Sequence, residues 1–177
     1  MMQLLQPLAQ MPALQHLVME VDKPRLAAAA AAAWAQLPQL GGLVVAYFRD
    51  PVSRQQWEAI RSGLAAATSL TQLDLSAVVD HHAHGKWHKQ PVAACGALAG
   101  LTKLRDLHIR RSSRLVTSDA RQLTKLTGLT RLVLAGIRAG VGSRAAAALA
   151  RSCRQLRHLD LSECTCMEAH TWMKLAG

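Results

Sequence analysis

Aromatic residues are scarce in this chain of 177 residues, since four tryptophans, one tyrosine and one phenylalanine make up only 3% of it. Hydrophobic residues nevertheless account for 50% of the sequence, and alanine and leucine supply most of them. A core of leucine and alanine suits small, regularly repeated units better than one large interior filled with aromatic rings. A chain of this length can bury a core of its own and fits one ordinary domain.

Long apolar runs are also missing, and none approaches the ~18 residues that a membrane span requires. The seven alanines at 27–33 lie between Arg25-Leu26 and Trp34 and are too weakly apolar to serve as an anchor. The opening MMQLLQPLAQM lacks the basic leader and apolar middle of a secretory signal, and it lacks the arginines of a transit peptide. We expect a cytoplasmic or nuclear chain, or a mature or truncated product, with an organellar location left open.

Cysteines are few and irregularly spaced, so the sequence implies no disulfide framework. The four are Cys95, Cys153, Cys164 and Cys166. Reduced thiols in a reducing compartment are the simpler interpretation. The Cys-x-Cys pair at 164 and 166 has no companions and is a weak signal for a metal or redox site.

Acidic residues are nearly absent from the segment 103–157, which contains thirteen Lys or Arg but only Asp106 and Asp119 as acids. The net charge of +10 therefore comes from this one segment. Such an excess attracts acidic partners, either protein or nucleic acid, at low salt. The alternative is a solvated surface rich in arginine, which we favour because no nucleic-acid motif accompanies the charge.

What the sequence does contain is a repeat. The pattern Leu-x-x-Leu-x-Leu begins at residues 14, 40, 70, 104, 129 and 156, at intervals of 26, 30, 34, 25 and 27. The clear copies are LTQLDL (70–75), LRDLHI (104–109), LTRLVL (129–134) and LRHLDL (156–161), and the weaker ones are LQHLVM (14–19) and LGGLVV (40–45).

Each copy predicts a short strand, because its fourth and sixth positions, such as Leu73 and Leu75, point to one face. Helical stretches are expected between the strands, with N-terminal signals at Ser118-Asp119 and Ser143. One strand and one helix per ~26 residues predict an α/β solenoid, with a curved parallel sheet inside and helices outside. The expected helices cover residues 25–37, 54–67, 92–98, 119–125, 144–153 and 168–175.

These repeats resemble those of leucine-rich repeat proteins over nearly the whole chain. The copy LARSCRQLRHLDLSECTCMEAH (149–170) is similar to the cysteine-containing subclass, typical of the substrate-binding halves of F-box proteins and related eukaryotic recognition modules. The resemblance implies that Cys164, at the ninth position, is a buried thiol bonded to backbone in the turn after the strand. No F-box is present in the sequence. Neither end offers a clear polar cap, so we expect a single domain over 1–177 that is a fragment of a longer solenoid or is capped by a partner.

The segment DHHAHGKWHKQ (80–90) lies within the longest interval, and removing eight residues from it restores a step of 26. We therefore expect an inserted loop on the rim of the sheet. Its histidines suggest a zinc site as one interpretation. A solvated loop is the interpretation we favour, because Gly85 opposes a helix, and Lys86 and Lys89 oppose a cation. Trp87 is a candidate anchor for a partner. The possible ligands are His81, His82, His84 and His88.

The open face of the predicted sheet carries a mixed surface. Its position-five column has valine near both ends and a charged middle, and places Asp74 beside His108, with Ser76 one pleat along. Asp, His and Ser invite a hydrolase interpretation, but the open face and the absence of converging oxyanion donors favour a polar pair instead. Asp106 and Arg131 form a similar pair at position three. The position-five column reads Val18, Val44, Asp74, His108, Val133 and Asp160.

The sequence thus predicts a non-catalytic protein-recognition or scaffold module that needs no cofactor and belongs to a larger complex. The alternative is an accessory subunit of a ribonucleoprotein or another nucleic-acid assembly, held through the segment 103–157. The residues expected to contact a partner are His16, Tyr47, Asp74, Trp87, His108, Arg110, Arg131, His158 and Asp160.

Overall fold

Six parallel strands form one sheet, and their order in space follows their order in the sequence. The computed structural model describes residues 11, 13–20, 24–46, 54–75, 95–110, 121–136 and 142–164. The strands are β1 (His16–Glu20), β2 (Gly42–Ala46), β3 (Gln72–Asp74), β4 (Asp106–His108), β5 (Arg131–Val133) and β6 (His158–Asp160).

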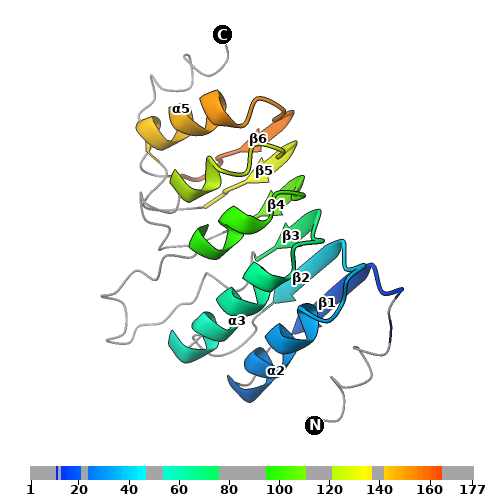
Figure 1. Cartoon of the computed structure of the whole chain (residues 1–177). Coiled ribbons are helices and arrows are strands. Elements are labelled where there is room, and N and C mark those ends of the chain that lie inside the picture. The colour runs from blue at the N-terminus through cyan, green and yellow to red at the C-terminus, as the bar shows by residue number, and fades with distance from the viewer. Residues whose placement is uncertain are drawn as a thin grey trace.

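The helices lie along one side of this sheet, stacked in the same order as the strands (Figure 1). They are α2 (Pro24–Trp34), α3 (Arg54–Ala66), the 3₁₀ helix η3 (Cys95–Gly100) and α5 (Ser143–Ser152). The predicted α/β leucine-rich-repeat solenoid is therefore the observed fold.

The strands pair so that equivalent repeat positions stand side by side. Leu73 pairs with Leu43 on one side and with Leu107 on the other, and Leu107 pairs in turn with Leu132. These four leucines are 0–2% exposed, and each contributes about 1.5–3 kcal/mol by leaving water. Their counterparts in the outer described strands, Leu17 and Leu159, are only partly buried.

A continuous hydrogen-bond ladder joins the repeats just before each strand. The position-two amides of residues 41, 71, 105, 130 and 157 each donate to the position-two carbonyl of the preceding repeat, at 2.7–2.8 Å. The following amide donates to the same carbonyl, as Asp106 does to Thr71 at 3.0 Å. The hydroxyls of Thr71 and Thr130 add a third donor. The ladder needs no particular side chain, so it tolerates Gly41, Arg105 and Arg157 at the same position.

A tight turn precedes every strand. The amide of the first leucine of each repeat donates to the carbonyl three residues earlier, as Leu104 does to Leu101 at 3.0 Å. The residue that offers the carbonyl is buried in the later five repeats, where it is Leu37, Ala67, Leu101, Leu126 or Cys153.

The first two described helices pack closely because small residues face each other. Gly63 of α3 meets the backbone of α2, where an added Cβ would lie 2.6 Å from the Ala31 Cα and 2.7 Å from its carbonyl oxygen. Ala30, Ala31 and Ala33 are buried in this contact region, together with Leu64. These buried alanines therefore give α2 a thin face at this contact.

Several predicted helix limits differ from the observed ones. The helix expected over 25–37 ends at Trp34, where Leu37 closes a turn and Pro38 follows without an amide hydrogen. The helix expected over 92–98 is instead the 3₁₀ helix Cys95–Gly100, whose two glycines disfavour an α-helix. Ser143 is not a cap but the first residue of α5, and Gly142 holds the cap position without a side-chain bond.

The expected helix 119–125 is helical from Arg121 to Leu123, within its described part. The segment at 168–175 lies outside the described residues, as do Ser118 and Asp119.

The turns that follow β5 and β6 adopt the left-handed conformation at the same repeat position. Gly136 has φ 72°, and Glu163, 27 residues later, has φ 59°. The amide of Gly136 donates to the carbonyl of Ser162 at 2.7 Å, which joins the two turns directly.

Candidate binding surface on the open face of the sheet

Two rows of side chains cross the face of the sheet opposite the buried leucines. The position-three row is His16, Gly42, Gln72, Asp106, Arg131 and His158. The position-five row is Val18, Val44, Asp74, His108, Val133 and Asp160, as the sequence predicted. Since both rows cross all six strands, a partner on this face meets several repeats at once.

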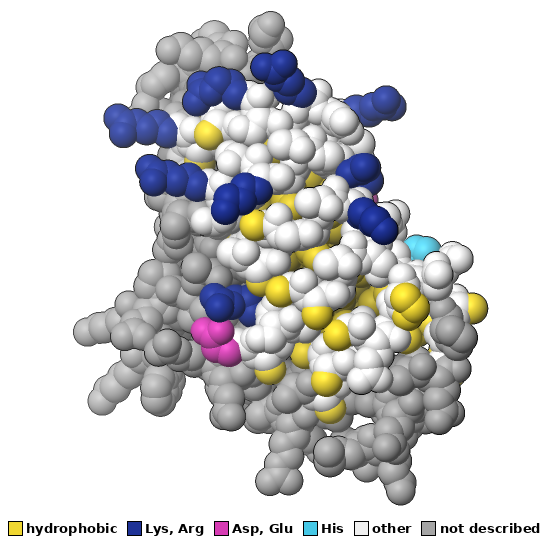
Figure 2. All heavy atoms as spheres, in the orientation of Figure 1, with side chains coloured by type: hydrophobic (Ala, Val, Ile, Leu, Met, Phe, Trp, Pro, Cys, Tyr) yellow, Lys and Arg dark blue, Asp and Glu magenta, His cyan; other side chains and the backbone are white. Residues whose placement is uncertain are grey.

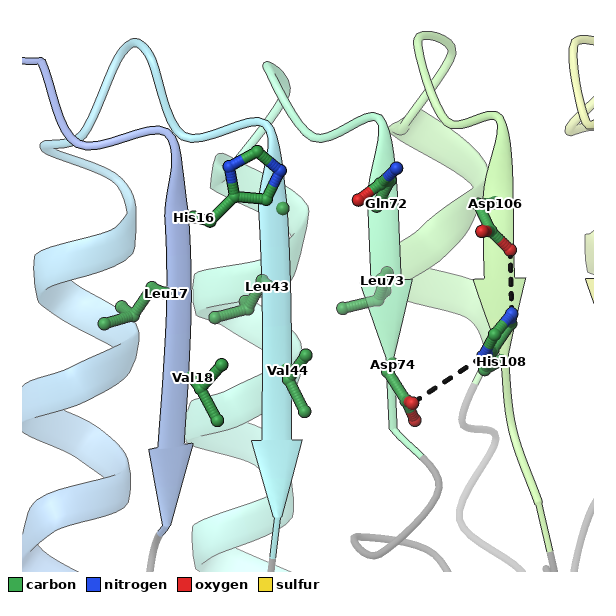
Figure 3. A pocket seen from close by; sticks show the side chains of 11 residues that line it. His16, Leu17, Val18, Leu43, Val44, Gln72, Leu73, Asp74, Asp106 and His108 are labelled. Atoms are coloured by element: carbon green, nitrogen blue, oxygen red, sulfur yellow. Dashed lines mark ion pairs between the residues drawn. The ribbon is translucent and has the colours of Figure 1, made fainter.

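A hollow of about 210 Å³ lies over β1–β4 on this face (Figure 3). Its apolar end is formed by Val18, which is 72% exposed, and by the half-buried Val44. Its polar end is formed by Gln72, Asp74, Asp106 and His108 on β3 and β4. The hollow therefore changes from apolar to acidic across the strands.

His108 lies between two carboxylates. Its Nδ1 is 3.6 Å from Asp74 Oδ2, and its Nε2 is 2.9 Å from Asp106 Oδ1 (Figure 3). Asp106 Oδ1 and His108 Nε2 are both buried, and the geometry of their approach does not meet the criteria of a hydrogen bond. The predicted neighbours Asp74 and His108 are thus in contact, and Asp106 reaches His108 as well as standing beside Arg131.

His16 closes the other end of the hollow. Its ring lies over Gly42, where an added Cβ would collide with the ring Cδ2. Glycine at this position of β2 therefore lets an exposed imidazole lie flat across the neighbouring strand. The sequence pattern could have indicated this, because position three holds a bulky or polar side chain in all five of the remaining repeats.

The side chains that line the hollow determine what chemistry it offers. The described residues that line it include two imidazoles and two carboxylates but no serine, threonine, cysteine or lysine. Ser76, the residue that would complete a hydrolytic set, lies outside the described residues. Within the ranges that the structure describes, no three His, Cys, Asp or Glu side chains are grouped to hold a metal ion.

The face changes character beyond β4. Asp160 accepts a hydrogen bond from the Ser162 amide at 2.9 Å. Bonds from the Ser162 side chain and backbone lower the pKa of the Asp160 carboxyl, with smaller contributions from the charges of Arg110 and His158. Arg110, Arg131 and His158 are exposed. Charged groups therefore dominate this part of the face.

One expectation about this part is wrong. Val133 was expected in an exposed apolar patch but is fully buried, because it lies in its row between the larger side chains of His108 and Asp160. The exposed apolar surface of the described rows is therefore at the β1–β2 end.

Of the nine residues expected to contact a partner, seven lie on this face, in its two rows or next to them. They are His16, Asp74, His108, Arg110, Arg131, His158 and Asp160. Tyr47 and Trp87 lie outside the described residues, together with the rim loop 80–90 and its histidines 81, 82, 84 and 88. The metal and loop predictions stay predictions. Val18, Val44, Gln72 and Asp106 line the hollow but were not among the nine.

Basic side chains gather over the later repeats, towards the top of the view (Figure 2). Among the described residues, the ion pairs join Glu58 to Arg61 and the two aspartates to His108. None of the later basic side chains belongs to one of these pairs, and all are exposed: Lys103, Arg105, Arg110, Arg121, Lys125, Arg131, Arg144, Arg151, Arg154 and Arg157.

Buried thiols hold backbone groups in the later repeats. Cys164 Sγ donates to the Leu134 carbonyl at 3.1 Å, which is the role that the repeat resemblance implied for it. Cys153 Sγ lies 3.6 Å from the Leu126 carbonyl, and burial raises the pKa of this thiol. These contacts fasten one repeat to the one before it.

No family model and no curated protein matches this sequence. Among solved structures, the crystal structure of a TLR13–ssRNA13 complex aligns with 93% of this chain at 14% identity and a TM-score of 0.32. The aligned region is 35% of that protein, so this chain spans about a third of its length.

Helices long and apolar enough to cross a membrane are absent from the part of the chain that the structure describes.

Proposed function

We propose that this protein is a non-catalytic recognition or scaffold module that binds a partner protein through the open face of its sheet. The observation that carries the proposal is the hollow over β1–β4, which joins an apolar end at Val18 and Val44 to a charged end at Asp74, Asp106 and His108. Protein interfaces combine apolar centres with polar rims in this way. Trp87 belongs to the proposal as a partner anchor, and Tyr47 as a further contact residue, as expected from the sequence.

The charged part of the face gives the direct test. Reversing both exposed arginines, Arg110→Glu with Arg131→Glu, is expected to weaken binding of a partner isolated with the native chain by at least about tenfold. The matched control, Arg144→Glu with Arg151→Glu, makes the same charge change on α5 and is expected to leave binding within about twofold. Equal affinity of the native and open-face variants, with unchanged melting curves, would rule out this face as the site.

An accessory role in a nucleic-acid assembly is the second candidate, and the exposed basic side chains of 103–157 favour it. RNA bound through phosphates would lose affinity steeply as salt rises. It would also lose affinity by a similar factor for each arginine pair, on the sheet or on α5. The two variants therefore separate the functions, because a protein partner on the open face distinguishes between the pairs whereas a polyanion does not.

We further infer that the repeats are of the cysteine-containing type. The support is the geometry of Cys164, a buried ninth-position thiol that donates to the Leu134 carbonyl of the preceding repeat. Cys153, buried before the same strand, adds to it.

A further inference from the structure

We infer that the hollow over β1–β4 binds an extended peptide segment of the partner that presents an apolar side chain and, two residues later, a lysine or arginine. The inference rests on the proposed function and names the chemistry of the partner at that surface.

The size of the hollow indicates side chains of a larger partner. At about 210 Å³ it is smaller than the roughly 300–1,000 Å³ of pockets that enclose a small molecule. It is also open along the strands, because it is built from two rows of a sheet face. A segment lying across the strands from β1 to β4 covers three strand spacings, roughly 14 Å, which corresponds to about four extended residues.

The apolar end provides the first contact. Val18 is 72% exposed although it is a large hydrophobic residue, and Val44 stands beside it in the row. Covering an exposed valine removes apolar area from water and so favours binding. The His16 ring borders the same end without adding a fixed charge.

The acidic end provides the second contact. Asp74 and Asp106 stand on neighbouring strands, with side chains 33% and 27% exposed, respectively. The two carboxylates make this end of the hollow acidic in a chain whose net charge is positive. A cationic side chain of the partner complements it, and partial shielding from water strengthens the attraction beyond that of a surface ion pair.

The two ends determine the spacing of the motif. Side chains two residues apart in an extended segment lie on the same side, roughly 6.6 Å from each other. A long basic side chain can extend from there to the carboxylates of β3 and β4. The motif is therefore an apolar residue, any residue, then lysine or arginine. Where the segment continues over Arg131 and Arg110, acidic residues fit it better.

The test uses the full chain and a displayed library of random twelve-residue peptides selected at pH 7.5. Enriched peptides that lack Asp, Glu and His are then synthesised and titrated. We expect them to share the apolar-x-basic motif, and Asp106→Asn to weaken their binding by about tenfold. The matched control Glu58→Gln, which removes one carboxylate elsewhere, is expected to change it by less than about twofold.

The outcomes separate this inference from the proposed function. Peptides that lose binding with Val18→Asp or Arg131→Glu but not with Asp106→Asn would keep the open face as the site and overturn the chemistry assigned to the hollow. An acidic consensus, or no peptide above background, would also overturn it. Binding that is insensitive to every open-face substitution would remove the proposed function itself.

Discussion

The earlier and later repeats of this molecule share one backbone arrangement but differ in their core packing and in their exposed side chains. In the earlier repeats, α2 and α3 meet through Ala31 and Gly63, and the open face is apolar at Val18 and Val44. In the later repeats, thiols at Cys153 and Cys164 bond to backbone, and exposed arginines cover the surface.

The difference teaches that the ladder before the strands, and not the surface, defines the fold. The backbone hydrogen bonds at position two are the same from residue 15 to residue 157, whether that position holds glycine, threonine or arginine. Surface chemistry is therefore free to vary from repeat to repeat. That freedom allows one face to carry an apolar end, an acidic centre and a basic flank.

The largest effect is expected from a core leucine in the middle of the array. Leu107→Ala should cost about 3 kcal/mol of unfolding free energy, because Leu107 is fully buried between Leu73 and Leu132. Leu159→Ala, at the equivalent position of β6, should cost about half as much because Leu159 is only partly buried. Urea unfolding of the two variants measures the difference, and equal losses would contradict the unequal burial.

The close helix contact of the earlier repeats gives the next effect. Gly63→Ala should destabilise the chain by about 1–2 kcal/mol, since the new methyl group collides with the Ala31 backbone. This loss runs against the gain of about 1 kcal/mol that alanine normally brings to a helix. Gly96→Ala is the control, because nothing lies within 4 Å of the added Cβ. Thermal melts that show both variants unchanged or stabilised would refute the contact.

The thiols of the later repeats should contribute less. Cys164→Ala removes the donor to the Leu134 carbonyl and should cost about 1 kcal/mol, whereas Cys164→Ser keeps a donor and should lose less. Chemical unfolding under reducing conditions compares them. If the serine variant were the weaker of the two, the thiol would matter for packing and not for its hydrogen bond.

The smallest effect is electrostatic and depends on pH. Because the folded state lowers the pKa of Asp160, its stabilisation is present above the pKa of the unfolded chain, near 3.9, and is lost as the pH falls through the folded value. Asp160→Asn should therefore cost well under about 1 kcal/mol at pH 7 and nothing at pH 2. Melting curves at the two pH values test the sign, and a larger loss in acid would contradict it.

The sequence was sufficient to predict the strands and their neighbours. The repeat spacing placed Asp74 beside His108, and the register confirms it. It could not show that Asp106 reaches His108, because a contact along one strand depends on side-chain rotamers and not on spacing. The burial of Val133 was missed for a related reason, since exposure at a row position depends on the size of its neighbours.

The helix limits were predicted less well. A periodic apolar pattern continues through a turn, so residues 35–37 looked helical although the chain turns after Trp34. The role of Gly63 could not be predicted from the sequence, because a single glycine in a helix indicates a close approach of two helices only when the opposite helix is known. Local signals fix which elements form, and contacts between repeats fix where they end.

The turn at Glu163 shows that contacts between repeats also affect the backbone conformation of a single residue. Glutamate seldom adopts a left-handed conformation, whereas the glycine at the matching place in the previous repeat adopts it without strain. The bond from the Gly136 amide to the Ser162 carbonyl connects the two turns. The contact between these two repeats thus stabilises a conformation at Glu163 that glutamate alone does not favour. A repeat excised from its neighbours should lose this turn first.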